Sequence, residues 1–137
     1  MKRQSVEVKV KQLIRYSHCD EWEVEELSCE GIYTELKSYR KLEYQDAMQR
    51  NVSLKWANDA QIDHLEIRMP EYTLQFKHQL TTQTPYMTPQ GLWLLDVHTN
   101  QLAYQASSDY VSLDIAYQLS VPQGPLGEYQ FQLQFNH

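Results

Sequence analysis

An arginine and a histidine, Arg40 and His78, lie among apolar residues in an alternating pattern that is typical of strands. Arg40 shares one strand face with Leu42 and Tyr44, and His78 shares another with Phe76. A buried guanidinium must be paired or bound to an anion, because leaving it alone costs several kcal/mol. Both residues are therefore candidates to hold the head of an anionic or amphipathic ligand. The alternative is that a bulge or strand end turns each side chain to solvent, or that a local carboxylate satisfies it.

Aromatic residues in the same inward phase would line the body of such a ligand. Inward aromatic side chains are more often plain core than a binding surface, so a filled interior is the competing interpretation. Together with the arginine and the histidine, the predicted ligand-binding set is Arg40, Tyr44, His78, Trp93, Tyr117 and Phe131.

Motifs for catalysis and metal binding are missing from the sequence. It has no G-x-S-x-G elbow, no phosphate loop, no G-x-G-x-x-G turn and no H-E-x-x-H. The five histidines show no short ligand spacing, and the adjacent His18, Cys19 and Asp20 would rarely converge on one ion. We expect no catalytic residue, no metal and no cofactor, and an enzymatic role is the least favoured.

The elements that must position these side chains are strands, because apolar residues recur with a period of two. The alternation is clearest in residues 5–16, 71–80, 111–121 and 129–136. No segment keeps a helical apolar stripe for three turns, so we expect little or no helix. Turn-forming residues punctuate the strands at 17–20, 58–60, 99–101, 107–109 and 122–127, and a β-bulge is expected at Glu25 and Glu26. Residues 81–91, with two prolines and a glycine, predict a loop.

Eight to ten antiparallel strands, each with one apolar face, must close on themselves or pack as two sheets. Strands of this length suit a tilted barrel, whose interior is either filled by side chains or able to hold one small ligand. The 137 residues predict a single domain over 1–137.

Charge is unevenly distributed along the chain. The 18 acidic and 12 basic residues give a net charge of −6, which argues against a general nucleic-acid binder. Residues 20–30 are acidic and the first strand carries Lys9, Lys11 and Arg15. A hairpin would pair these charges on a solvated face, or leave an acidic surface for a basic partner.

The first residues have no apolar signal region, and no window is long and apolar enough for a membrane anchor. We therefore expect a cytoplasmic protein without membrane contact. In that compartment Cys19 and Cys29 would stay reduced.

Several segments resemble the YwiB-like family of small bacterial proteins. They include VEVKVKQLIRY in the first strand, EGIY at 30–33, LEY at 42–44, LEIR at 65–68, the Tyr-x-Thr-Pro-x-Gly block at 86–91, LLDVHT at 94–99 and GEYQFQLQF at 127–135. The resemblance implies a calycin-like, lipocalin-like β-barrel of no established activity. The positions that match the family pattern are Gly31, Tyr33, Arg68, Tyr86, Thr88, Pro89, Gly91 and Thr99. Pro70 departs from the pattern, because the family tends to place a glycine there.

Arg68 lies on the strand face opposite Leu65 and Ile67, so it points outward beside Glu66. Such an arginine usually forms a surface ion pair, but it could anchor a homodimer interface. The function that we expect is non-enzymatic binding of a small apolar or amphipathic ligand inside the barrel. The alternative is a protein-interaction module that acts through the acidic surface or as a homodimer.

Overall fold

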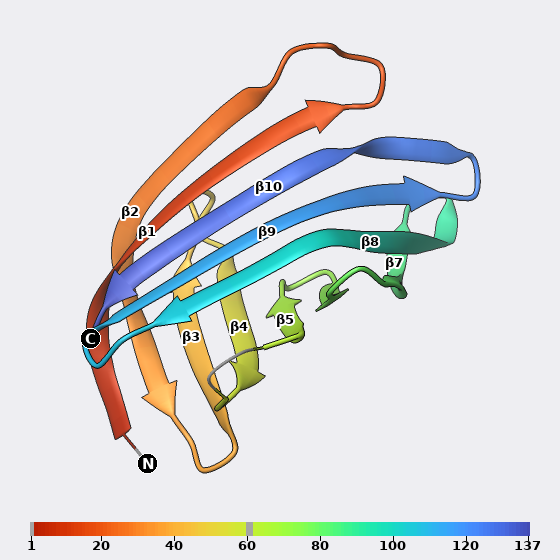
Figure 1. Ribbon diagram of the computed structural model, residues 1–137. Helices are drawn as coiled ribbons and strands as arrows, with labels where there is room; N and C mark the ends of the chain where they lie inside the picture. Colours follow the sequence, from red (N-terminus) through yellow and green to blue (C-terminus); the bar gives the residue numbers. More distant parts are fainter. Residues whose placement is uncertain (1, 60–61) are drawn as a thin grey trace.

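The period-two segments form ten antiparallel strands in the computed structural model, which describes residues 2–59 and 62–137 (Figure 1). The strands are β1 (Lys2–Tyr16), β2 (Glu23–Glu35), β3 (Tyr39–Gln45), β4 (Asn51–Ala57), β5 (His64–Arg68), β6 (Thr73–Lys77), β7 (Thr81–Thr88), β8 (Gly91–Ala106), β9 (Tyr110–Val121) and β10 (Gly124–Asn136). The described residues contain no helix, so the predicted all-β class is confirmed.

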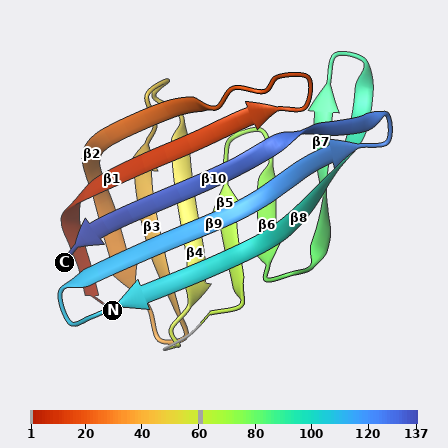
Figure 2. The ribbon, with the colours of Figure 1, turned by 45° about the horizontal axis from the view of Figure 1, so that its top comes forward.

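All ten strands belong to one sheet, in the order β6-β5-β4-β3-β2-β1-β10-β9-β8-β7. Two meanders, β1 to β6 and β7 to β10, are joined where β1 pairs with β10. Figure 2 shows the long strands β1, β10, β9 and β8 crossing over the shorter strands β3 to β6. This arrangement is the predicted barrel of eight to ten strands, in a nearly closed form.

The barrel closes at a seam between β6 and β7, the two end strands of the sheet order. Side chains span this seam: the Thr82 hydroxyl donates to the Gln75 carbonyl at 2.6 Å, and the Thr84 hydroxyl to the Thr73 carbonyl at 2.9 Å. No backbone ladder between β6 and β7 is found in the described part of the chain. Threonine hydroxyls thus replace a part of the missing ladder.

Gly31 marks the place where β2 leaves one layer of the barrel for the other. The strand pairs with β1 along its whole length, but with β3 only from Gly31 to Glu35. A Cβ atom at Gly31 would lie 2.8 Å from Val8 Cγ2 and 2.9 Å from the Glu43 carbonyl oxygen, so only glycine fits without a shift. Residues 23–30 consequently have β1 on one side and a free edge on the other.

The bulge predicted at Glu25 and Glu26 is wrong, because the β1–β2 register runs without a shift through both residues. The bulge was expected because the apolar alternation shifts between Val24 and Leu27, and this shift has another cause. Val24 is 54% exposed on the free edge of β2 and takes no part in the core. The bend of the strand lies at Gly31 instead.

The predicted loop over 81–91 is also wrong, since these residues form β7 and its turn into β8. Pro85 is tolerated because β7 is an end strand, where a missing N–H breaks no ladder on the open side. The turn is built by Thr88, whose hydroxyl donates to the Gly91 carbonyl at 2.8 Å and accepts from the Gln90 amide at 3.2 Å. Gly91 adopts a φ of 118°, which glycine tolerates.

Of the other predicted turns, the one at 99–101 is a register shift inside β8, which continues to Ala106. The turns at 17–20 and 107–109 separate strands as expected, and 122–127 is shorter because β10 already begins at Gly124. Ala60, at the end of the turn predicted over 58–60, lies outside the described residues.

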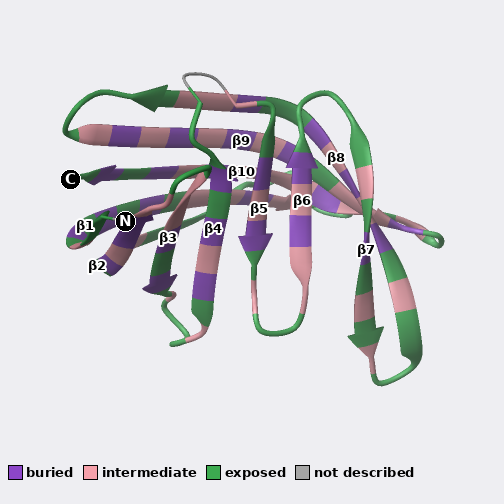
Figure 3. Ribbon diagram, turned by 90° about the horizontal axis from the view of Figure 1, so that it is seen from below, coloured by how far each residue is buried: buried purple, intermediate pink, exposed green. Residues whose placement is uncertain are grey.

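The core follows the strand alternation, with buried and exposed positions succeeding one another along the ribbon (Figure 3). The middle of the barrel is solid, because large side chains from both layers fill it. The largest that are almost fully buried are Trp56, Tyr33, Phe76, Phe135, Leu42, Leu54, Leu65, Leu113, Ile115 and Leu133. No helix in the described residues is long and apolar enough to span a membrane.

Candidate functional site

A cavity of about 630 Å³ occupies one end of the barrel interior. Its wall comes from β1, β2, β3, β4, β5, β6, β9 and β10, together with the β3–β4 connection. The apolar and aromatic part of the lining consists of Val10, Ile14, Leu27, Tyr44, Ala47, Met48, Val52, Ile67, Met69, Tyr72, Leu74, Tyr117, Leu119, Tyr129 and Phe131. The polar part consists of Gln12, Glu25, Glu26, Asp46 and Arg50.

The mouth of the cavity lies between the free edge of β2 and the β3–β4 connection. A surface groove of about 970 Å³ runs there, and it shares Leu27, Tyr44, Asp46, Val52 and Met69 with the cavity. The free edge of β2 that follows from the bend at Gly31 therefore gives the interior its opening.

Three of the predicted ligand-binding residues, Tyr44, Tyr117 and Phe131, line this cavity together. They come from β3, β9 and β10, which are distant in the sequence, so the barrel fold brings them into one place. That they bind a ligand stays a prediction.

Arg40 faces the interior as predicted, but at the opposite end of the barrel. It pairs with Trp56 across β3 and β4, four residues along β3 from Tyr44. Its Nη1 donates to the Tyr104 hydroxyl at 3.0 Å, which links β3 to β8 across the barrel. Tyr33 stacks on Trp56 with ring centroids 6.4 Å apart and closes this end. Arg40 is therefore not among the residues that line the cavity, and that it binds a ligand stays a prediction.

His78 and Trp93 also lie outside the cavity. His78 follows the last residue of β6, where the alternation ends, and its exposed ring accepts the Leu102 amide at Nδ1, 3.2 Å away. Trp93 is half-buried opposite Tyr86 in the β7–β8 hairpin and does not line the cavity. That either residue binds a ligand stays a prediction.

Most of the family-pattern positions have structural roles. Gly31 forms the bend of β2, Thr88, Pro89 and Gly91 form the β7–β8 turn, and Tyr33 is fully buried at the closed end. Thr99 is fully buried beside the register shift in β8.

Tyr86 packs edge-on against Tyr72 at 5.5 Å. Arg68 is exposed on β5, and in the described residues its neighbour Glu66 is bonded to Gln75 and forms no ion pair with it. The surface ion pair expected for Arg68 is therefore replaced by a polar contact between β5 and β6.

Four tyrosines, Tyr44, Tyr72, Tyr117 and Tyr129, surround the deep part of the cavity. Tyr117 and Tyr129 stack at 5.1 Å with an interplanar angle of 10°. Burial raises the pKa of all four phenols, and the neighbouring Tyr72 and Tyr129 hydroxyls raise the pKa of Tyr117 further. These hydroxyls are therefore neutral at physiological pH and present both hydrogen-bonding groups and aromatic rings to the cavity.

Tyr72, Tyr129 and Arg50 are site residues that the sequence reasoning missed. A signal was present for the tyrosines: Tyr72 is in phase with Leu74, and Tyr129 is in phase with Phe131. Arg50 carried no such signal, because it lies outside the alternating segments.

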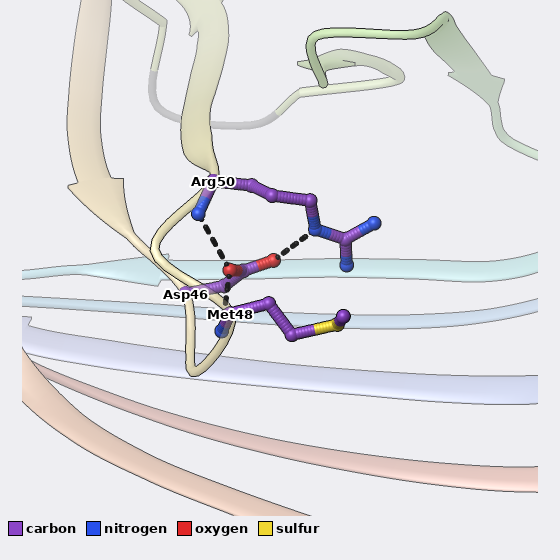
Figure 4. A network of polar contacts seen from close by, with 3 residues as sticks. All are labelled: Asp46, Met48 and Arg50. Carbon is purple, nitrogen blue, oxygen red and sulfur yellow. Dashed lines mark hydrogen bonds and ion pairs between the residues drawn. The ribbon is translucent and has the colours of Figure 1, made fainter.

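Asp46 organises the β3–β4 connection at the mouth (Figure 4). Its carboxylate accepts the Met48 and Arg50 amides at 2.9 Å each and the Arg50 Nε at 2.9 Å. Burial alone would raise the pKa of Asp46, but the hydrogen bonds from Arg50 and Met48 outweigh it and lower that pKa. The Arg50 guanidinium is thus held by a charged partner inside the loop.

Alkaline pH is expected to destabilise the fold through the cavity tyrosines. Because their pKa values are raised in the folded state, the stability they contribute is fully present below the ordinary phenol pKa of about 10. It is lost as the pH rises from there toward the folded-state pKa values. Tyr117→Phe removes one such group, so the free energy of unfolding should fall less steeply above pH ~10 in this variant.

Urea unfolding at neutral pH and at pH ~11 measures this difference. Tyr110→Phe is the control, because the Tyr110 hydroxyl lies on the surface and donates to Gln134. An equal pH dependence in wild type and Tyr117→Phe would contradict the prediction.

The other potential metal ligands, the two cysteines and the charged residues of the first hairpin form no further site among the described residues. Among the described residues, no group of three or more His, Cys, Asp or Glu side chains is placed to hold a metal. Cys19 and Cys29 are free, and burial raises the pKa of Cys29. The expected ion pairing of the acidic run with β1 is not found among the described residues: Lys11 lies opposite Glu26 without an ion pair, and Arg15 pairs with Glu128 on β10.

Comparison with known proteins places the chain in a family. It is similar to the crystal structure of the ywiB protein from Bacillus subtilis, with a TM-score of 0.76 and 15% identity over 98% of this chain and 92% of that one. At this identity the likeness shows the fold. No curated protein matches the chain. A family model described as a domain of unknown function (DUF1934) matches residues 8–133. The predicted YwiB-like resemblance is thereby confirmed, and the chain belongs to the DUF1934 family.

Proposed function

We propose that the barrel binds a small amphipathic molecule, with its apolar body in the cavity and its polar head at the mouth. The observation that carries this proposal is the hollow end of an otherwise solid barrel. Its volume of about 630 Å³ lies in the range of ligand pockets, roughly 300–1,000 Å³. The lining is mainly apolar and aromatic with a few polar groups, which is the usual composition of such pockets.

The chemistry of the walls favours binding over catalysis. The four tyrosines are neutral at physiological pH, and the Asp46 and Arg50 side chains are engaged with each other. This arrangement can orient a polar head group through hydrogen bonds from and to the phenols.

Filling the cavity tests the proposal. Leu119 lines the cavity from β9 and is only partly buried, so Leu119→Trp places an indole in the hollow space. Leu94→Trp is the control, because Leu94 is 43% exposed on β8 and does not line the cavity. The ligand probe is N-phenyl-1-naphthylamine, a neutral dye whose fluorescence rises in apolar surroundings.

We expect saturable dye binding to wild type and Leu94→Trp, and a loss of about tenfold or more in affinity for Leu119→Trp. Circular dichroism checks that both variants are folded. Displacement of the dye by 1-octanol provides a second measurement on wild type. Absence of saturable dye binding, or equal affinity in a folded Leu119→Trp variant, would refute a ligand site in this cavity.

Interaction through the acidic surface, or as a homodimer, stays a prediction. The free edge of β2 carries much of the acidic run, and the β7–β8 hairpin exposes Met87 and Leu92. The cavity is the more specific feature, because it combines a defined volume with convergent polar groups.

A further inference from the structure

The polar groups at the cavity mouth carry an excess of negative charge. Three carboxylates line it, those of Glu25, Glu26 and Asp46, against one guanidinium, that of Arg50. No lysine or histidine is among the lining residues. Because Arg50 is hydrogen-bonded to Asp46, these two largely neutralise each other. Of the two glutamates, Glu26 lies opposite Lys11 across the β1–β2 ladder, so Glu25 is the one without a facing cation.

Glu25 is the carboxylate placed best to meet a ligand. It lies on the same face of β2 as Leu27 and pairs across the ladder with Gln12, which also lines the cavity. None of the ion pairs found in residues 2–59 and 62–137 involves Glu25. The Glu25 carboxylate is therefore available at the entrance to the apolar interior.

The tyrosines in the deep part of the cavity also favour a positively charged ligand. Tyr44 and Tyr117 are at least nine-tenths buried, at 7% and 5% exposed, and both line the cavity. Aromatic rings attract cations through their negative faces, and phenol oxygens accept hydrogen bonds from ammonium groups. A quaternary or protonated amine is the head group that such an aromatic, acid-rimmed pocket favours.

We propose that the ligand of this barrel is an organic cation, an apolar body that carries a protonated or methylated amine, recognised by Glu25 and the tyrosines. This inference rests on the proposed function and names the charge of its ligand. The ligand charge that we infer is opposite to the anionic head group expected from Arg40 and His78, because those two residues lie outside the cavity. An anionic head would meet the Glu25 carboxylate, which lies opposite Gln12 and has no facing cation.

A matched set of three ligands tests the charge preference. Octyltrimethylammonium, 1-octanol and octanoate share an eight-carbon chain and differ in head-group charge. Their dissociation constants are measured by calorimetry below micellar concentrations. We expect the ammonium to bind about tenfold more tightly than the alcohol, and octanoate to bind more weakly than the alcohol. Added salt should weaken the binding of the ammonium alone.

Two variants locate the preference within the chain. Glu25→Gln should reduce the affinity for the ammonium severalfold and leave that for 1-octanol unchanged. Glu7→Gln removes the same charge from the outer face of β1 and should change neither affinity. Because Glu25 is exposed, its substitution does not threaten the fold.

The outcomes separate the two proposals. If the three ligands bind with equal affinity, or if Glu25→Gln weakens all of them alike, the cation preference is refuted and the ligand-binding barrel stands. If octanoate binds most tightly, the cavity prefers an anionic head group and the inferred preference for a cation is refuted. If none of the three binds and the naphthylamine dye does not bind either, the proposed function fails as well.

Discussion

Truncation of Trp56 to alanine is expected to lower the free energy of unfolding by about 3–5 kcal/mol. The Trp56 side chain is 2% exposed at the closed end of the barrel, where it stacks on Tyr33 and packs against Tyr104 with centroids 6.3 Å apart. Its removal leaves a cavity lined by aromatic rings that the surrounding strands cannot collapse to fill. The Arg40 hydrogen bond to Tyr104 lies beside this ring pair and would lose packing support.

Urea unfolding followed by circular dichroism measures the change. Trp22→Ala is the matched control, because Trp22 is 39% exposed beneath the Arg15 guanidinium. We expect this control to cost about 1 kcal/mol or less. Trp56→Phe should cost clearly less than Trp56→Ala, because it retains an aromatic ring and removes a buried indole N–H that lacks a partner. Similar losses for Trp22→Ala and Trp56→Ala would contradict the assigned packing.

Adding one methyl group at Gly31 is expected to destabilise the fold by about 1–3 kcal/mol. In an ordinary strand position, replacing glycine with alanine is favourable, because glycine loses more backbone entropy on folding. At Gly31 the new Cβ meets the Glu43 carbonyl oxygen at 2.9 Å and Val8 Cγ2 at 2.8 Å. The bend of β2 must then open, and the β2–β3 pairing that begins at Gly31 must shift.

A double-mutant cycle with Val8→Ala separates the two contacts. Val8→Ala takes away the side-chain clash and leaves the clash with the Glu43 carbonyl, so the double variant should recover only a part of the loss caused by Gly31→Ala. The same unfolding measurement serves all three variants. A stabilised Gly31→Ala protein would show that β2 does not bend as tightly as described.

The strands and the barrel could be predicted from the sequence because their signal is local. Alternation in β1, β9 and β10 reports which side chains face inward, and Tyr44, Tyr117 and Phe131 were placed correctly on that basis. The β7 strand was missed because its residues carry few apolar side chains, and because Pro85 lies within it and Pro89 directly follows it. An end strand held by threonine hydroxyls leaves little periodic pattern.

The candidate site was only partly predictable from the sequence. Alternation shows which face of a strand a side chain lies on, but it does not show how far along the barrel that side chain lies. Arg40 and Tyr44 share an inward face, yet they lie at opposite ends of the interior. The end of β6 at Lys77 decides that His78 is exposed, and the turn residues that follow it do not reveal that boundary. The acidic mouth depends on β2 departing from its neighbour at Gly31, which is a property of tertiary packing.

The pairing of β1 with β10 sets the order in which this chain can assemble. Every other ladder of the described strands joins neighbours in the sequence, so each meander can form through hairpins with short loops. The β1–β10 ladder instead joins strands from the two ends of the sequence, and its loop-closure entropy is the largest of any ladder. Two locally folded halves therefore meet in one long-range step, and that step completes the curved wall around the ligand cavity.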